Sequence, residues 1–176
     1  AALALHRDLP FHLAEQRAGR WSWRDVAPVE QCRVGVMGLG ELGRAALETL
    51  RGLGFRTLGW SRSRANIEVT QCFAGTDELS AFLGQSQILV CLLPLTDETR
   101  GFLCHDLFAR LPQGAGLINV ARGGHLVERD LVDALASGQL RHAVLDVADP
   151  EPLPEGHPFR THPAIMLTPH VAGVTR

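Results

Sequence analysis

The segment that most constrains the fold is a glycine-rich turn, Gly38-Leu39-Gly40-Glu41-Leu42-Gly43, with the spacing GxGxxG. The chain holds 18 glycines, so the spacing alone could arise by chance. Here, however, the turn directly follows an apolar stretch of strand length, Cys32 to Met37, and opens a helical stretch, Leu42 to Gly52. In a strand–turn–helix unit, such glycines allow a tight turn, the approach of a pyrophosphate to the backbone, and close packing of helix on strand. The segment therefore predicts a dinucleotide-phosphate site at the helix N-terminus.

Apolar runs alternate with helical stretches from Arg33 onward. The runs are short, apolar throughout and bounded by Gly or Pro, which is typical of strands covered on both faces. The predicted strands are Cys32–Met37, Arg56–Trp60, Ile88–Leu93, Gly116–Ala121, Ala143–Val147 and Ile165–Thr168. The predicted helices are Leu42–Gly52, Asp77–Gln85 with Thr76 as N-cap, His105–Arg110, and Glu128–Ser137 followed by Gly138. This alternation predicts an α/β fold of Rossmann type, a doubly wound parallel sheet in three layers and a single domain.

The two ends of the chain differ from this pattern. Residues 1–29 contain a helical stretch, Pro10 to Ala18, and two tryptophans, Trp21 and Trp23, before any strand. We interpret them as a linking arm, and residues 30–176 as the dinucleotide-binding domain. Asp149 to Pro163 holds five prolines and is expected to form a rigid, irregular loop.

The composition excludes several classes of partner. Hydrophobic residues make up 45% and charged residues 20% of the chain, and the net charge of −2 favours neither nucleic acid nor an anionic membrane. No apolar run approaches the roughly 20 residues that span a bilayer. The cysteines are widely spaced and form no CxxC, which predicts reduced thiols in a cytoplasmic protein without a metal site. They are Cys32, Cys72, Cys91 and Cys104.

The end of the second predicted strand indicates which dinucleotide is bound. Enzymes that use NAD commonly carry Asp or Glu about 20 residues after the glycine turn, where it holds the ribose hydroxyls. Here the strand ends Gly59-Trp60-Ser61-Arg62-Ser63-Arg64, without a carboxylate. A carboxylate would repel a 2′-phosphate, whereas a guanidinium pairs with it. We therefore expect NADPH, with NAD less favoured, and contacts from Ser61, Arg62 and Ser63.

Three polar residues follow predicted strands at widely separated points of the chain. They are Arg122, Glu151 in the proline-rich loop, and His170 in Thr168-Pro169-His170. Ligands of open α/β sheets bind at the carboxyl ends of the strands, so these side chains are candidates to meet there. Arg122 could polarise a keto group, His170 could supply a proton, and Glu151 could favour the protonated imidazole. Taken singly, an arginine after a strand usually forms a surface ion pair, and a histidine in a proline-rich end usually has a structural role.

Several segments together resemble the D-isomer-specific 2-hydroxyacid dehydrogenases, in the order of that family. They are Val36 to Gly43, Leu92-Leu93-Pro94-Leu95-Thr96-Asp97-Glu98-Thr99, Asn119-Val120-Ala121-Arg122-Gly123-Gly124, Leu145-Asp146-Val147 with Glu151-Pro152-Leu153, and Thr168 to Gly173. The resemblance implies that Arg122, Glu151 and His170 are the catalytic Arg, Glu and His. It also implies cofactor contacts from Asp146 to the nicotinamide carboxamide, and from Leu93, Pro94, Thr99, Ala121, Arg122 and His170. Ala148 departs from the family, because many members carry an aromatic residue there.

Within the family, the strongest resemblance is to the NADPH-dependent glyoxylate/hydroxypyruvate reductases. It rests on Trp60 to Arg64, on Val174-Thr175-Arg176, and on Arg7, Pro10, Gln16, Gly19 and Trp21 of the arm. It implies reduction of a small 2-keto acid and a homodimer formed through the cofactor domain. The family's substrate lobe has no counterpart here, so we expect an excised cofactor domain that is inactive in isolation.

Two alternatives stay open at this point. A corepressor branch of the same family senses dinucleotides without catalysis, but the basic turn after Trp60 disfavours the NAD expected there. A formate- or phosphite-type oxidoreductase has a similar fold, but the formate enzymes carry Gln where Glu151 stands.

Overall fold

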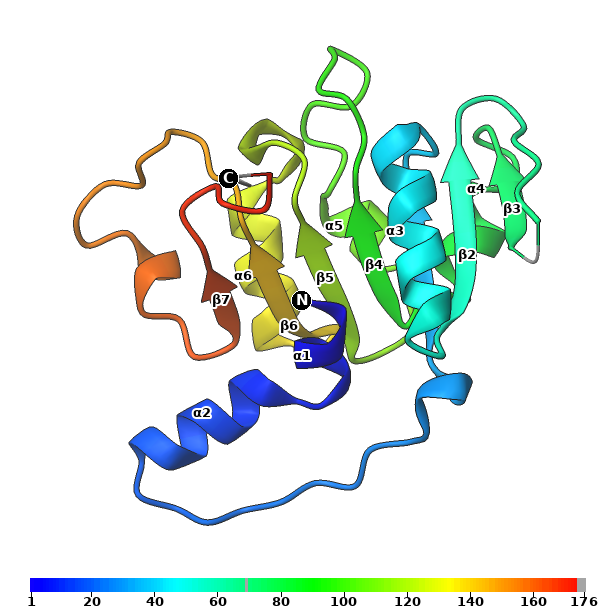
Figure 1. Cartoon of the computed structure of the whole chain (residues 1–176). Helices are drawn as coiled ribbons and strands as arrows, with labels where there is room; N and C mark the ends of the chain where they lie inside the picture. Colours follow the sequence, from blue (N-terminus) through cyan, green and yellow to red (C-terminus); the bar gives the residue numbers. More distant parts are fainter. Residues whose placement is uncertain (69, 174–176) are drawn as a thin grey trace.

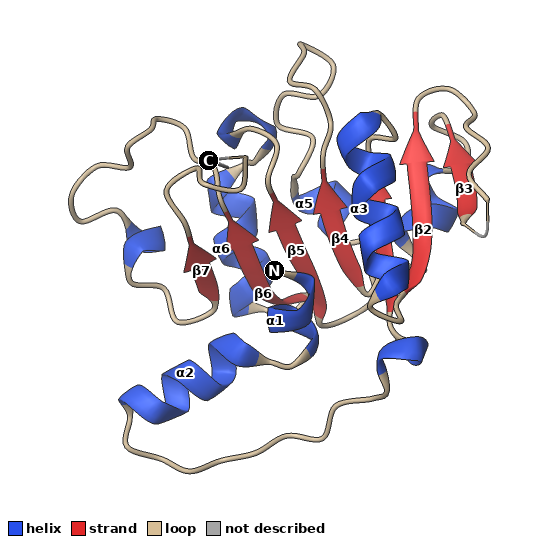
Figure 2. Cartoon of the chain, viewed as in Figure 1, coloured by secondary structure: helices blue, strands red, loops and turns tan. Residues whose placement is uncertain are grey.

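The apolar runs of the sequence assemble into one sheet of seven parallel strands, in the order β3-β2-β1-β4-β5-β6-β7 (Figures 1 and 2). This computed structural model describes residues 1–68 and 70–173. The strands are β1 (Arg33–Met37), β2 (Arg56–Ser61), β3 (Gln71–Ala74), β4 (Ile88–Cys91), β5 (Ala115–Asn119), β6 (Leu140–Leu145) and β7 (Ile165–Leu167). The α-helices are α1 (Ala2–His6), α2 (Leu9–Arg17), α3 (Glu41–Gly52), α4 (Leu79–Leu83), α5 (His105–Phe108) and α6 (Glu128–Ala136). Short 3-10 turns are η1 (Val29–Gln31), η2 (Gly123–His125) and η3 (Pro158–Arg160).

Helices cover both faces of the sheet, which confirms the predicted doubly wound fold in three layers. Helices α1 and α3 lie on one face and α4, α5 and α6 on the other (Figure 1). Every residue of β4 and β5 is buried, because these central strands contact helices on both sides. One buried cluster centres on Leu47 of α3 and Val34 of β1, and a second on Phe82 of α4 and Leu131 of α6. The central strands therefore hold the loops at their carboxyl ends in fixed positions.

The structure corrects the sequence prediction at three places. Strand β3 was not predicted, because this short edge strand buries only Phe73 and so lacks a continuous apolar run. Strand β6 begins three residues before the predicted Ala143, since polar Arg141 and His142 interrupt the apolar pattern. Thr76 is not an N-cap: helix α4 starts at Leu79, and its N-cap residue Glu78 makes no capping hydrogen bond.

The C-terminal end of α6 is as predicted, with Gly138 in the left-handed region at φ +74° directly after the helix. Val174, Thr175 and Arg176, which contribute to the resemblance, lie outside the described residues.

The arm contacts the sheet through its first turn and leaves its later part exposed. Leu5 of α1 is buried in the cluster on the α3 face. The buried carboxylate of Asp8 accepts a hydrogen bond from His142 Nε2 of β6 at 2.6 Å and one from Arg24 at 3.1 Å. Helix α2 confirms the helical stretch predicted from Pro10. Beyond it, Trp21 is fully exposed and Trp23 is 75% exposed.

Further observations concern membranes, metals and thiols. Within residues 1–68 and 70–173, no helix has the length and apolarity to cross a membrane, and no three potential metal ligands cluster together.

All four cysteines are free thiols. Burial raises the pKa of Cys32 and of Cys91 to about 11, so both thiols are protonated at neutral pH.

Candidate active site

The glycine turn joins β1 to α3 at the carboxyl edge of the sheet. The Gly38 N–H donates to the carbonyl of Trp60 at 2.8 Å, which ties the turn to β2. Gly43 presses against the start of the turn, because a Cβ there would lie 1.8 Å from the Gly38 oxygen. Only glycine allows this close approach. Buried Leu39 packs against Gly59 of β2 and fills the space beneath the turn.

The N-terminus of α3 is open toward solvent and suited to an anion. Its N-cap is Gly40, which supplies no side-chain cap, so the first N–H groups of this 12-residue helix remain free. No atom lies within 4 Å of a Cβ built on Gly40, which leaves room for a ligand against the backbone. Leu42 is 75% exposed in the first turn, beside Glu41. The residues present therefore fit a dinucleotide pyrophosphate.

The basic turn after β2 carries two arginines that pair with carboxylates. Arg62 contacts Glu98 of the loop after β4 at 3.0 Å, and both side chains are exposed. Arg64 pairs with Glu78, which also accepts a hydrogen bond from the Ala74 N–H. The hydroxyl of Ser61 donates to the Ser63 carbonyl at 2.7 Å and shapes the turn. Solvent screens exposed pairs of this kind, so they contribute little to stability and a phosphate could replace a carboxylate partner at little cost.

The loop after β4 is held in shape by its own side chains. The hydroxyl of Thr99 donates to the Pro94 carbonyl at 2.7 Å and accepts from the Thr96 N–H at 2.8 Å. Leu93 is buried at the start of this loop. Fully buried His125 lies between two loops, with Nε2 3.3 Å from the Pro94 carbonyl and Nδ1 3.0 Å from the Arg122 carbonyl.

Arg122 stands three residues after the end of β5, on a backbone held by several contacts. Its carbonyl accepts a hydrogen bond from Nδ2 of buried Asn119 at 3.1 Å. The next residue, Gly123, abuts the following loop so closely that a Cβ would lie 2.0 Å from the carbonyl atoms of Ala148. The exposed guanidinium donates one hydrogen bond to the Ala121 carbonyl at 2.6 Å. Its other N–H groups are available to a ligand.

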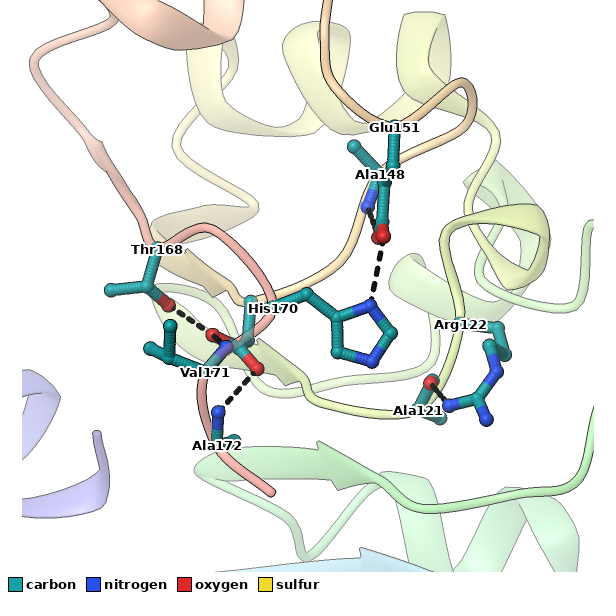
Figure 3. A network of polar contacts seen from close by, with 9 residues as sticks. Ala121, Arg122, Ala148, Glu151, Thr168, His170, Val171 and Ala172 are labelled. Atoms are coloured by element: carbon teal, nitrogen blue, oxygen red, sulfur yellow. Dashed lines mark hydrogen bonds and ion pairs between the residues drawn. The ribbon is translucent and has the colours of Figure 1, made fainter. Parts of the chain in front are cut away.

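Glu151 and His170 form a hydrogen-bonded pair, although 18 residues separate them in the sequence. Nδ1 of His170 donates to Glu151 Oε2 at 2.8 Å, and Glu151 Oε1 accepts from the Ala148 N–H at 2.8 Å (Figure 3). The hydrogen bond from His170, followed by that from Ala148, holds the pKa of Glu151 below its ordinary value. The carboxylate is therefore ionised at neutral pH and fixes the ring, and within residues 1–68 and 70–173 Nε2 of His170 makes no hydrogen bond and can take another partner. The side chains of His170 and Glu151 are 45% and 38% exposed.

Asp146, at the end of β6, is almost completely buried beneath the His170 loop. Its carboxylate accepts hydrogen bonds from the Thr168 hydroxyl at 2.5 Å and from the N–H groups of Val171 at 3.0 Å and Ala172 at 2.9 Å. Burial by itself would raise the pKa of Asp146. These three hydrogen bonds and the nearby His170 outweigh it and hold the pKa below the ordinary value.

The structure thus brings every sequence-predicted site segment to one edge of the sheet. In the view of Figure 3, the His170 ring lies between Glu151 and Arg122. This arrangement provides a cation and a histidine beside a dinucleotide cradle, which suits carbonyl reduction. Sequence analysis missed Asn119 and His125, which hold the Arg122 backbone. Both lie within three residues of Arg122, and Asn119 opens the motif quoted for the resemblance, but neither signal assigns them this supporting role.

The fold and this edge define a class of protein, the dinucleotide-binding domains of Rossmann type. Residues 1–172 match the model described as "D-isomer specific 2-hydroxyacid dehydrogenase, NAD binding domain". The chain belongs to the D-isomer specific 2-hydroxyacid dehydrogenase family and corresponds to the NAD-binding domain of its members. The resemblance inferred from the sequence motifs is therefore confirmed.

Known relatives agree with this assignment. Glyoxylate/hydroxypyruvate reductase A of Serratia proteamaculans (strain 568) is 48% identical over 155 residues, covering 87% of this chain and 50% of that protein. A D-isomer specific 2-hydroxyacid dehydrogenase of Xanthobacter autotrophicus Py2, solved with NADPH and MES, superposes with a TM-score of 0.94 at 44% identity, covering 99% of this chain and 55% of that one. The NADPH-dependent glyoxylate/hydroxypyruvate reductase of Sinorhizobium meliloti, solved with NADP and sulfate, superposes with a TM-score of 0.90 at 38% identity. The match covers 97% of this chain and 55% of that one. The chain spans about half the length of the curated relatives it matches.

Proposed function

We propose that the chain is the cofactor-binding part of an NADPH-dependent reductase that converts small 2-keto acids, glyoxylate and hydroxypyruvate, into 2-hydroxy acids. The observation that carries this proposal is the 2.8 Å pair of His170 and Glu151 at the same sheet edge as Arg122. The relatives from Serratia and Sinorhizobium support it, because both bear the name glyoxylate/hydroxypyruvate reductase.

In this proposal the three side chains have separate tasks. NADPH held on the glycine turn and the basic turn would supply the hydride that the carbonyl carbon of the keto acid needs, and would be oxidised to NADP⁺. Arg122 binds the substrate carboxylate and stabilises the charge that develops on the carbonyl oxygen. His170 gives its Nε2 proton to that oxygen, which completes the hydroxyl group. Glu151 holds Nδ1, so that the ring is oriented and its positive charge is balanced.

A substrate panel tests the proposal on the full-length protein that contains this chain. We expect glyoxylate and hydroxypyruvate to oxidise NADPH, measured as loss of its absorbance, and formate or phosphite not to reduce NADP⁺. NADPH binding with no turnover on any keto acid would instead favour a cofactor sensor and would contradict the proposal.

We also propose the cofactor contacts and the domain boundary. The pyrophosphate would lie on Gly38 to Gly43 and the 2′-phosphate on Ser61, Arg62 and Ser63. The nicotinamide half would contact the remaining predicted residues, namely Leu93, Pro94, Thr99, Ala121, Arg122, Asp146 and His170. Residues 1–29 would be the arm that leads in from the substrate domain, and residues 30–176 the cofactor domain. The four free thiols support a cytoplasmic location.

The chain is expected to bind NADPH at least about tenfold more tightly than NADH, because one charge-assisted hydrogen bond contributes about 1.5–3 kcal/mol. Changing Arg62→Ala together with Arg64→Ala should remove this difference and leave NADH affinity unchanged. Titration calorimetry with NADPH and with NADH measures the two dissociation constants in the wild-type chain and in the double variant. Arg33→Ala with Arg56→Ala is the matched control, since it removes two exposed arginines at the opposite edge of the sheet. Equal affinities in the wild-type chain would contradict NADPH specificity.

The chain is also expected to form a homodimer through the cofactor domain, with Trp21 and Trp23 of the arm in the interface. Trp21 is fully exposed and Trp23 is 75% exposed, and exposed aromatic groups of this size mark interfaces. Trp21→Ser with Trp23→Ser should therefore convert the dimer to a monomer in light scattering. Leu53→Ser, at an exposed leucine beside α3, should leave the dimer intact. A wild-type chain that stays monomeric at high concentration would rule out this interface.

A further inference from the structure

We propose that Asp146 and Thr168 are positioning residues that hold His170 against Glu151, a role separate from any contact of Asp146 with the cofactor. The inference rests on the proposed function only in so far as His170 is taken as the proton donor. The geometry of the loop itself is independent of that assignment.

The loop that carries His170 needs an anchor, because it is exposed and strained. All residues from Thr168 to Gly173 are exposed. His170 adopts φ +56°, in the left-handed region that residues other than glycine rarely occupy. Such a conformation persists where surrounding contacts over-determine it. Without an anchor, the loop would relax and the ring would leave Glu151.

Asp146 supplies that anchor from below the loop. Its backbone carbonyl accepts from the His170 N–H at 2.8 Å, and its carboxylate accepts from the N–H groups of the next two residues. Asp146 is only 3% exposed, so it cannot exchange these partners for water. A carboxylate offers about four acceptor positions, and three are occupied. The side chain is therefore committed mainly to the His170 loop.

Thr168 orients this carboxylate from the other side. Its hydroxyl donates to Asp146 Oδ1, the same oxygen that accepts from the Val171 N–H. A threonine hydroxyl carries no formal charge, so its removal weakens the anchor without removing a charged group from the site. The two residues thus allow two independent tests of one role.

The pKa of Glu151 reports whether His170 stays in place, because the hydrogen bond from His170 is the largest cause of its lowering. We expect Asp146→Asn to raise the Glu151 pKa toward the value in His170→Ala, measured by ¹³C NMR of the side-chain carboxyl in this chain without cofactor. Removal of the Asp146 charge alone would lower that pKa, so the sign separates positioning from electrostatics. A Glu151 pKa that is unchanged or lower in Asp146→Asn overturns the proposal.

Thr168→Val is the second test. It is needed if circular dichroism shows that Asp146→Asn does not fold. We expect a smaller rise of the Glu151 pKa in Thr168→Val, and the wild-type value in Thr168→Ser, which keeps the hydroxyl. No rise in Thr168→Val overturns the proposal.

In the full-length protein, Thr168→Val should lower kcat while the KM for the keto acid and the Kd for NADPH stay unchanged, and Thr168→Ser should restore kcat. If Asp146 acted only on the cofactor, Thr168→Val would leave kcat unchanged. That result would also overturn the proposal. If the full-length protein reduces no keto acid, the proposed function fails, whereas the Glu151 titration still tests the positioning role.

Discussion

His170→Ala in the full-length protein is expected to lower kcat for keto-acid reduction by about 10²- to 10⁴-fold, the usual contribution of a positioned proton donor. The affinity for NADPH should change little. His170 is 45% exposed and contributes no packing to the two buried clusters, so its removal should leave the fold intact. Steady-state kinetics with glyoxylate and fluorescence titration with NADPH measure the two quantities.

His105→Ala is the control for this experiment, because His105 is an exposed histidine on α5 whose ring makes a polar contact with Asp106 and, among the described residues, with no other side chain. It should leave kcat unchanged. Arg122→Ala should differ from both, with a higher KM as well as a lower kcat, since one side chain binds the substrate and stabilises the developing charge. A His170→Ala protein that retains near-normal kcat would remove His170 from its proposed role.

The chain by itself is expected to bind NADPH and yet reduce glyoxylate at least about 10⁵-fold more slowly than the full-length protein. The phosphate turn, the basic turn and Asp146 all lie in this chain, so the proposed cofactor contacts are within it. The proposed catalytic pair, however, is open to solvent: His170 and Glu151 are 45% and 38% exposed. Alignment of a keto acid with the hydride can contribute roughly 7–11 kcal/mol, and an open edge of a sheet does not provide it.

The comparison requires both proteins under the same conditions, with NADPH affinity measured first as the control for folding. Similar Kd values for NADPH together with a large loss of turnover would show that the lost rate is due to poor alignment of the keto acid. Comparable turnover numbers would contradict the prediction and show that the substrate site is complete within these 176 residues.

The sequence by itself determined the fold class, because the relevant signals are local. An apolar strand, a GxGxxG turn and a helix start lie within about 20 consecutive residues, and each has a direct steric reason. The place of Arg122, Glu151 and His170 also followed from the sequence, since the carboxyl ends of parallel strands share one edge. Their chemical roles gained support only when the family motifs were added.

Other features depended on tertiary contacts that leave no local pattern. Strand β3 is stabilised by pairing with β2 rather than by an apolar run of its own. Thr76 has the chemistry of an N-cap, but the chain turns into α4 three residues later. Local propensity is too weak in such short elements to compete with packing.

The anchoring of the site was decided by the tertiary structure alone. Asp8 and His142 are 134 residues apart in the sequence and form a buried hydrogen bond. Asp146 and the Val171 N–H are 25 residues apart, and His125 and Pro94 are 31 apart. A buried polar group must find a partner, but the sequence does not say which one, because the partner is selected by the folded positions of two backbones. The sequence thus determined which chemistry the chain carries, and the fold determined which residues hold that chemistry in place.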